Sequence, residues 1–144
     1  MIKVICVGKI KEQYLKDLIN DYLKRINKYH KLDIIELKDS NIIDESKEIL
    51  KYVNSKDYII TMDINGNKLS SVELSKKIDN LLMNYSNITF IIGGSYGLHD
   101  DVKSVSNYSL SFSDLTFPHG LFRGLLLEQI YRSFKILNNE SYHK

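Results

Sequence analysis

The amino-acid sequence predicts an α/β fold, a single domain in which helices flank a mostly parallel sheet. Three observations predict it. The apolar residues change repeatedly between the two-residue spacing of strands and the three-to-four-residue spacing of helices. One strand-like run, Ile88 to Gly94, is apolar almost throughout, as is typical of a strand covered on both faces. The chain has 144 residues, the length of one compact domain, so we take 1–144 as one unit.

The first half of the chain alternates between strand-like and helix-like runs. Ile2 to Gly8 (IKVICVG) is short and rich in β-branched residues, which indicates a strand. Lys11 to Tyr29 repeats apolar residues at helical spacing, with lysines on the other side, and predicts an amphipathic helix. Leu32 to Lys38 (LDIIELK) predicts a second strand, Ser46 to Val53 a short helix, and Asp57 to Ile64 (DYIITMDI) a third strand.

Turn and capping signals divide the middle of the chain. Asn65 to Asn67 (NGN) indicates a turn after the third strand. Ser70 and Glu73 have the spacing of a capping box, which predicts a helix that begins there and continues through Leu82. The apolar run Ile88 to Gly94 then follows as the central strand.

The last third of the chain predicts a short helix near His99, a strand from Tyr108 to Ser113 and the longest helix from Pro118 to Leu137, with the proline in its first turn. The apolar residues of this last helix cover more than one stripe of its surface. We therefore expect a second copy of the chain to cover part of the helix, as in a homodimer. The alternative is a helix covered within one chain. Glu128 and Gln129 either bridge two protomers or are solvent-facing breaks in the apolar surface, and we favour the latter.

The composition sets limits on the class of protein. The net charge is only +2, so the sequence does not predict a strongly basic nucleic-acid-binding surface, although a local basic patch is compatible with it. The single cysteine, Cys6, lies in an apolar run and is expected in the core, which suits a reducing compartment. The four histidines are far apart in the sequence and show no metal-ligand spacing. We see neither a secretory signal nor a membrane span, and expect a cytoplasmic protein.

Polar and glycine-rich segments follow three of the expected strands: MDINGNKLS, IIGGSYGLHDD and SFSDLTFPHG. Ligands of open parallel sheets bind beyond the carboxyl ends of the strands, so these segments are the candidate site. Gly93, Gly94 and Gly97 allow the backbone to approach a ligand closely. The P-loop and the dinucleotide-binding fingerprint are both missing, and a tight strand-to-helix turn explains the glycines equally well. Spacing alone therefore does not identify the ligand.

Three segments together resemble one known family: IIGGSYGLHDDV, NYSLSFSDLTFPHGLFRGLLLEQIYRSFKI and the terminal ESYHK. They are similar to the SPOUT-class ribosomal RNA large subunit methyltransferase H family, whose members methylate a pseudouridine of large-subunit (23S) ribosomal RNA. The opening VICVGKIKEQYLKDLINDYLKRI resembles the amino end of the family as well. The resemblance covers nearly the whole chain and is strongest over its last third. The segment from Asp39 to Lys56 is short relative to the family.

The resemblance implies a fold and a cofactor. The fold is an α/β domain whose carboxyl-terminal segment passes through a loop to form a trefoil knot, an exception to the rule that chains do not thread loops. The cofactor is S-adenosylmethionine, bound by the knotted loops. Matched by position, the cofactor-binding residues are Met62, Gly93, Gly94, Phe112, Ser113, Asp114, Leu115, Thr116 and Phe117. Met62 replaces a leucine of the family, a change that conserves volume. Because the donor has its own activated methyl group, the transfer requires no metal.

The resemblance also implies the acceptor, which is the N3 imide of the pseudouridine, on the assembled ribosome. Its proton must leave, so a base or a local positive charge is expected at the site. The candidate catalytic residues are His143, Tyr142 and Arg123, and the candidate substrate-binding residues are Tyr142, His143, Lys144 and His119. We expect Tyr142 to stack on a base, His143 to orient or transfer the proton and Lys144 to attract phosphate, in the site of the partner protomer.

Other interpretations of these residues and of the whole chain stay open at this point. The tail is equally compatible with a frayed terminus, His119 with a histidine at a helix start, and Arg123 with a contact to the dimer partner or to an RNA phosphate. Transfer RNA is an alternative substrate. A non-catalytic nucleotide-binding module of flavodoxin-like architecture is the alternative from another class, since a fold does not determine a function.

Overall fold

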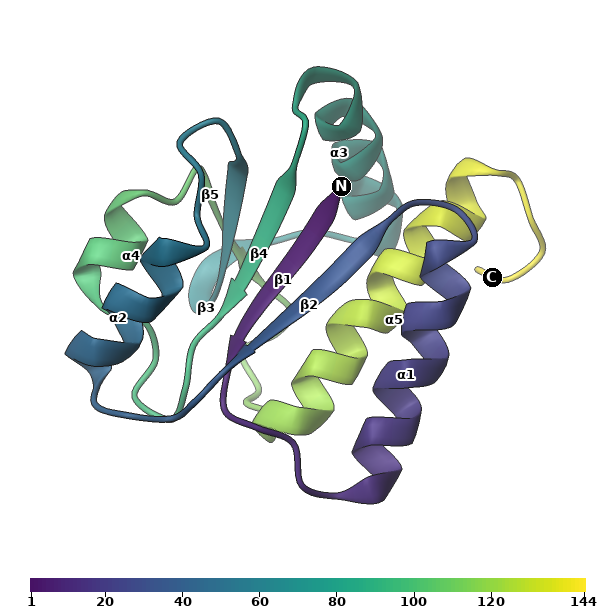
Figure 1. The fold of residues 1–144 in the computed structure, drawn as a ribbon. Helices are drawn as coiled ribbons and strands as arrows, with labels where there is room; N and C mark the ends of the chain where they lie inside the picture. Colours follow the sequence, from purple (N-terminus) through teal and green to yellow (C-terminus); the bar gives the residue numbers. More distant parts are fainter.

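A five-stranded parallel sheet forms the centre of the computed structural model, which describes all residues from 1 to 144 (Figure 1). The strands are β1 (Ile2–Val7), β2 (Leu32–Leu37), β3 (Tyr58–Lys68), β4 (Ile88–Ile92) and β5 (Tyr108–Ser111). They lie in the order β2-β1-β4-β3-β5, and every neighbouring pair is parallel. The predicted α/β class and the central position of β4 are therefore confirmed.

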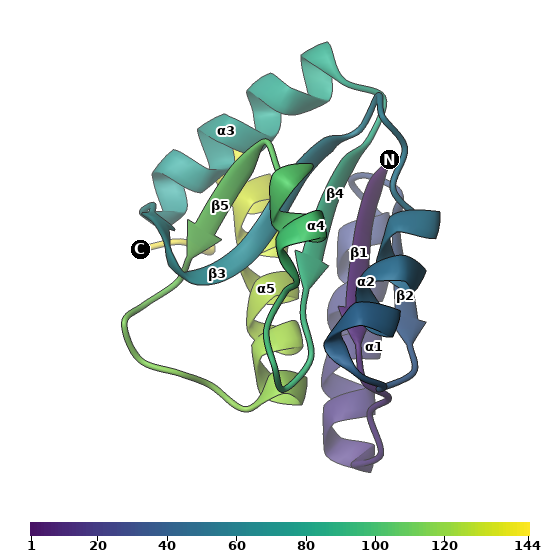
Figure 2. The ribbon, with the colours of Figure 1, turned by 90° about the vertical axis from the view of Figure 1, so that its left-hand side faces the viewer.

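Helices cover both faces of this sheet. They are α1 (Gln13–Asn27), α2 (Ile42–Lys51), α3 (Ser71–Asn84), α4 (Asp100–Ser104) and α5 (His119–Leu137). In Figure 2, α2 and α4 lie in front of the sheet, and α1 and α5 lie behind it. Each face has its own hydrophobic cluster, one that includes residues of α1, α3 and α5, and one that includes residues of α2 and α4. The sheet is thus the middle layer of three.

Strand β1 shows how the sequence specifies these two faces. Val4 and Cys6 belong to the cluster under α1, α3 and α5, whereas Ile5 and Val7 belong to the cluster under α2 and α4. Side chains of a strand point alternately to opposite faces, so a strand covered on both faces is apolar at every position. Cys6 is fully buried, and burial raises the pKa of its thiol to about 11. Its predicted place in the core is confirmed.

Two predicted boundaries were wrong. Helix α2 begins at Ile42, four residues before the predicted Ser46, because the side chain of Asn41 caps it by accepting a hydrogen bond from the amide of Asp44. The NGN segment is no chain-reversing turn but part of β3, where the pairing with β5 shifts register. Gly66 permits this bulge, since a Cβ atom there would lie 2.8 Å from the backbone of Ser109.

Helix α5 is covered largely within the chain. It packs against α1 on one side and α3 on the other, and its Leu126, Leu127 and Ile130 are completely buried. Leu121 is the one large apolar residue of this helix that is exposed, at 37%. This arrangement matches the alternative of a helix covered within one chain. The homodimer remains a prediction, as does the trefoil knot. None of the helices is long and apolar enough for a membrane span.

Candidate functional site

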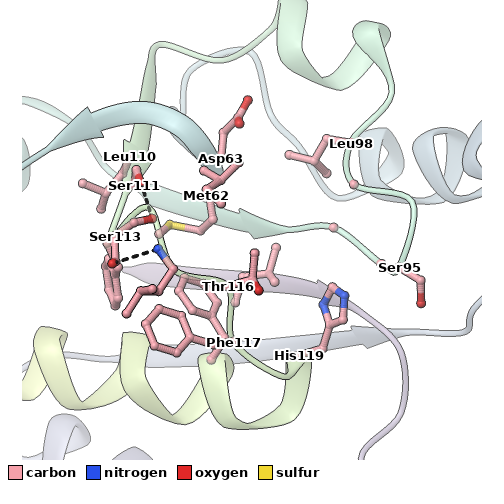
Figure 3. A pocket seen from close by; sticks show the side chains of 18 residues that line it. Met62, Asp63, Ser95, Leu98, Leu110, Ser111, Ser113, Thr116, Phe117 and His119 are labelled. Carbon is pink, nitrogen blue, oxygen red and sulfur yellow. Dashed lines mark hydrogen bonds between the residues drawn. The ribbon is translucent and has the colours of Figure 1, made fainter.

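The middle of β3 and the carboxyl ends of β4 and β5 lie together, and they and the segments after β4 and β5 enclose a cavity of about 380 Å³ (Figure 3). Strand β3 contributes Met62 and the two residues that follow it, and the loop after β4 contributes Gly93, Gly94, Ser95, Gly97 and Leu98. The loop after β5 closes the cavity opposite them and leads into the first turn of α5. The three strand ends selected from the sequence therefore form one site.

Aromatic residues form the wall of the cavity next to α5. The rings of Phe112 and Phe122 have centroids 5.0 Å apart, and Phe117 stacks on Phe122 at 6.1 Å. Met62 contributes its flexible thioether side chain to the same lining. A flat heterocycle such as adenine binds well between apolar surfaces of this kind.

The glycine loop after β4 folds back tightly on itself. Gly94 and Gly97 form an isolated bridge in which the Gly97 amide donates a hydrogen bond of 3.0 Å to the Gly94 carbonyl. Gly97 has a φ of +77°, a conformation that favours glycine. A Cβ atom on Gly93 would lie 2.6 Å from the Gly97 carbonyl oxygen, so no other residue fits there without a shift of the backbone. The backbone itself therefore lines this side of the cavity.

Serine hydroxyls hold the loop after β5. The Ser111 hydroxyl donates to the carbonyl of Ser113 at 3.1 Å, and the Leu115 amide donates to the Ser113 hydroxyl at 3.0 Å. The side chain of Ser113 thus organises a turn in the loop. Asp114, at the tip of this turn, is exposed and forms an ion pair of 2.6 Å with Lys68.

The structure brings together eight of the nine predicted cofactor residues around the cavity, all except Asp114. His119, predicted to contact substrate, also lines it from the start of α5 (Figure 3). Sequence reasoning missed lining residues that lie beside the predicted ones in the same segments, among them Asp63, Ile64, Ser95 and Leu98. Ser95 and Leu98 could have been found from their position after β4, whereas Asp63 and Ile64 follow Met62 within β3.

Arg123 lies outside this cavity. It is only 3% exposed, and its guanidinium donates to Glu36 Oε2 at 2.7 Å and to the carbonyl of Gly8 at 2.8 Å. These contacts fasten α5 to the ends of β1 and β2. Arg123 also lines a smaller pocket next to the cavity, together with His119.

The carboxyl-terminal tail folds back on the far end of α5 (Figure 1). The Tyr142 hydroxyl donates to Glu128 at 3.0 Å, and its ring meets Tyr131 edge-on. Burial, together with the hydrogen bond to Glu128, raises the pKa of the Tyr142 phenol. His143 Nδ1 lies 3.0 Å from Arg132 Nη1. The tail is therefore held against α5 as far as His143, in contrast to the alternative of a frayed terminus.

The tail and the cavity lie at opposite ends of α5. Arg132, which contacts His143, follows Phe122, the last cavity residue of α5, by ten residues, which corresponds to roughly 15 Å of helix, and neither Tyr142 nor His143 lines the cavity. Within one chain, the predicted catalytic residues of the tail therefore do not reach the cavity.

The interpretation of Glu128 and Gln129 as solvent-facing breaks was wrong. Glu128 accepts hydrogen bonds from Arg132 as well as from Tyr142, and Gln129 accepts one of 2.7 Å from Ser71 of α3. Both side chains join parts of the chain that are separated in sequence. No group of three or more His, Cys, Asp or Glu side chains in the structure could hold a metal ion.

Comparison with known proteins gives consistent matches. Residues 1–143 match the family described as "Predicted SPOUT methyltransferase". The chain is 50% identical to the "Ribosomal RNA large subunit methyltransferase H" of Clostridium botulinum and 43% identical to that of Acetivibrio thermocellus, over 99% of both chains in each pair. These alignments span 157 positions, more than the 144 residues of this chain, so they contain gaps in it. That difference agrees with the expected short segment, although it does not place the gaps.

Solved structures share the fold at low sequence identity. A tRNA (m1G37) methyltransferase from Aquifex aeolicus superimposes with a TM-score of 0.54 and 14% identity, over 91% of this chain and 69% of that one. A TrmH/SpoU tRNA modifying enzyme from the same organism gives a TM-score of 0.53 and 10% identity, over 95% and 77%. At such identities the likeness concerns the arrangement of strands and helices alone.

Proposed function

This chain belongs to the SPOUT methyltransferase family, and we propose that it transfers the methyl group of S-adenosylmethionine to N3 of a pseudouridine in large-subunit (23S) ribosomal RNA. The observation that supports this most directly is the cavity at the ends of β3, β4 and β5. It lies in a chain that aligns over 99% of its length with proteins named ribosomal RNA large subunit methyltransferase H.

The residues of the cavity fit the proposed cofactor. Its volume of about 380 Å³ is that of a small-molecule site. Met62, Phe112 and Phe117 provide apolar surface for an adenine ring, and the glycine loop opposite them leaves backbone groups open to hydrogen bonding. When bound, the cofactor supplies a methyl group that its positively charged sulfur already activates. The task of the chain is then to align donor and acceptor and to exclude water.

We also propose that the protein acts as a homodimer. Phe122 is the last residue of α5 that lines the cavity; His143 contacts Arg132, ten residues or roughly 15 Å farther along the helix, and Tyr142 contacts Glu128, six residues or roughly 9 Å farther. A second copy that packs against the first with its α5 in the opposite direction would bring its tail toward this cavity. Each site would then combine the cofactor pocket of one protomer with the substrate-contacting tail of the other.

The charge of the chain favours a substrate with preformed structure. With a net charge of +2, the protein makes few phosphate contacts and binds naked RNA weakly. An assembled ribosome in the cytoplasm presents the target nucleotide in a fixed shape, and recognition of shape requires less charge. We therefore propose the ribosome as the partner.

Mass mapping of modified nucleosides in large-subunit RNA tests the proposal. Cells that lack this chain should lose an N3-methylated pseudouridine, and the wild-type chain should restore it. Gly93→Ala should not restore it, because the added Cβ collides with the glycine loop, whereas Ser55→Ala in an exposed loop should. Persistence of the modification in the deletion strain would refute the substrate. A second test incubates the protein and methyl-labelled S-adenosylmethionine with ribosomes, with free subunits or with bulk transfer RNA. Label that appears in transfer RNA alone would favour transfer RNA as the substrate.

A further inference from the structure

Glu45, in the first turn of α2, has a buried carboxylate that the proposed methyl transfer does not use. The residue is only 4% exposed and forms no ion pair. Its Oε2 accepts a hydrogen bond of 2.9 Å from the amide of Ser40, whereas its buried Oε1 has no hydrogen-bond partner. A buried carboxylate that lacks a cation and leaves one oxygen unpaired destabilises a folded chain.

Asp57 provides a comparison within the same chain. It is also 4% exposed, but it forms an ion pair with Lys3 and accepts hydrogen bonds from Asn87 and Thr89. The chain thus satisfies both oxygens of a buried carboxylate where that group stabilises the fold. The free oxygen of Glu45 therefore requires another explanation.

The carboxylate of Glu45 lies against the glycine loop after β4. A Cβ atom on Gly94 would be 3.1 Å from Glu45 Oε1 and 3.3 Å from Oε2. Gly94 lines both the cofactor cavity and the smaller pocket next to it, whereas Glu45 lines neither. Glu45 therefore contacts the loop that forms the site without lining the site itself.

Two amides of the glycine loop are free to bind an acceptor of this kind. The amide of Gly97 donates to the carbonyl of Gly94, but the amides of Ser95 and Tyr96 donate to no carbonyl of the chain. Ser95 directly follows the glycine against which the carboxylate lies. A small displacement of the loop would therefore bring a free amide to the free oxygen of Glu45.

We propose that Glu45 is a positioning residue for the methyl transfer and acts through the glycine loop. The amide of Ser40 fixes its Oε2, and its Oε1 accepts a hydrogen bond from an amide of the loop when the methyl donor is bound. This inference rests on the proposed function. The chain without ligand then carries the cost of a half-satisfied carboxylate, and the bound state is favoured because the second oxygen gains a partner there.

Glu45→Gln tests this role, because it keeps the size of the side chain and replaces one carboxylate oxygen by an amide nitrogen. In calorimetry, the Kd for S-adenosylhomocysteine should rise about tenfold, the loss of one charge-assisted hydrogen bond. The Kd for 5′-methylthioadenosine, which lacks the amino-acid end, should rise equally, because the loop acts on the cavity and not on one end of the ligand. The melting temperature of the chain without ligand should be unchanged or higher, since the lost oxygen has no partner there.

Two other carboxylates of the chain serve as matched controls. Glu48→Gln changes an exposed residue three positions farther along α2 and should alter neither the Kd values nor the melting temperature. Asp57→Asn changes a buried carboxylate whose partners all belong to the fold. It should lower the melting temperature and leave both Kd values unchanged.

The other outcomes are distinguishable. A melting temperature of Glu45→Gln that falls as in Asp57→Asn would overturn the assignment and make Glu45 a structural residue. Unchanged Kd values would overturn it as well, and so would a weaker affinity for S-adenosylhomocysteine alone, which would indicate direct contact with the ligand. In these cases the proposed function stands. If the wild-type chain binds neither ligand, the proposed function fails, and this inference fails with it.

Discussion

Asp57 shows how a single residue stabilises the sheet on which the site is built. It directly precedes β3, is only 4% exposed, and its carboxylate forms an ion pair of 2.8 Å with Lys3 of β1. Asn87 donates to it at 3.0 Å and Thr89 of β4 at 3.1 Å. A buried carboxylate is costly unless it is paired and hydrogen-bonded, and here β1, β4 and the residue before β4 supply the partners.

From the hydrogen bonds to Asp57 we predict how the free energy of unfolding depends on pH. Burial alone raises the pKa of Asp57, but hydrogen bonds from Lys3, Asn87 and the backbone amide of Asn54 outweigh it, so the pKa lies below its usual 3.8. The unfolded chain then binds this proton more tightly than the folded one. The contribution of Asp57 to the free energy of unfolding is complete above pH 3.8 and is lost as the pH falls through the lower, folded value.

Asp57→Asn should therefore lower the free energy of unfolding by about 2 kcal/mol at pH 7. The difference from the wild type should shrink as the pH falls from about 5 to 2. Urea unfolding across this range measures both. Asp79→Asn, an exposed position on α3, serves as the control and should change little at any pH. A difference between Asp57→Asn and the wild type that stays constant down to pH 2 would contradict this account.

Among the secondary-structure elements, α1 and α5 pack unusually closely because of two glycines. Gly120 and Gly124 lie one turn apart on α5, and Cβ atoms there would lie 2.7 Å from Leu15 Cδ1 and 2.6 Å from Leu18 Cδ2, respectively. This close packing sets where the start of α5 lies relative to the loop after β1. The smaller pocket next to the cavity, which Arg123 and His119 line, lies between these two segments.

Gly124→Val should destabilise the chain by about 2 kcal/mol, because the added side chain overpacks the contact with Leu18. Gly124→Ala should change stability by less than about 1 kcal/mol, since the flexible end of Leu18 can move and alanine favours the helix. Leu18→Ala in the Gly124→Val background should recover part of the loss. Thermal unfolding of the two single variants and the double variant measures the coupling, and simply additive losses would show that the helices do not meet as described.

The strands and helices also show which features the sequence could and could not predict. Every strand and helix was predicted to exist, most of them from an apolar period, because most bury a defined face. The NGN segment was misinterpreted because pairing with β5, which is distant in sequence, prevailed over a local turn signal. The capping residue Asn41 was visible in the sequence but is an isolated signal, so α2 was begun too late.

At the scale of the whole molecule, the order of the strands decides which segments form the site. The resemblance to a family supplied the cofactor residues, and the structure collects all of them but Asp114 around one cavity. The smaller pocket next to the cavity was not predicted, although Gly8 and Asp39 also follow strand ends, because only the observed order β2-β1-β4 places these ends beside the glycine loop. The place of the tail was equally inaccessible, since Glu128 and Arg132 give no local sign that they hold Tyr142 and His143.

The separation of tail and cavity leads to a prediction about two copies of the chain. One protomer has Gly93→Ala, which disables its cavity, and the other has Tyr142→Ala with His143→Ala, which disables its tail. Homodimers of either variant should be inactive toward ribosomes. A heterodimer purified through two different tags contains one cavity that receives an intact tail from its partner, so it should keep about half of the wild-type activity.

The heterodimer distinguishes the two ways in which the tail can act. If each tail served the cavity of its own chain, neither protomer of the heterodimer would have a complete site, and the activity would be zero. Calorimetry with S-adenosylhomocysteine is the control, since the tail variant should bind it as the wild type does, and Gly93→Ala should not. A monomer in analytical ultracentrifugation that is still fully active would exclude a shared site, because one chain would then supply both the cavity and the tail.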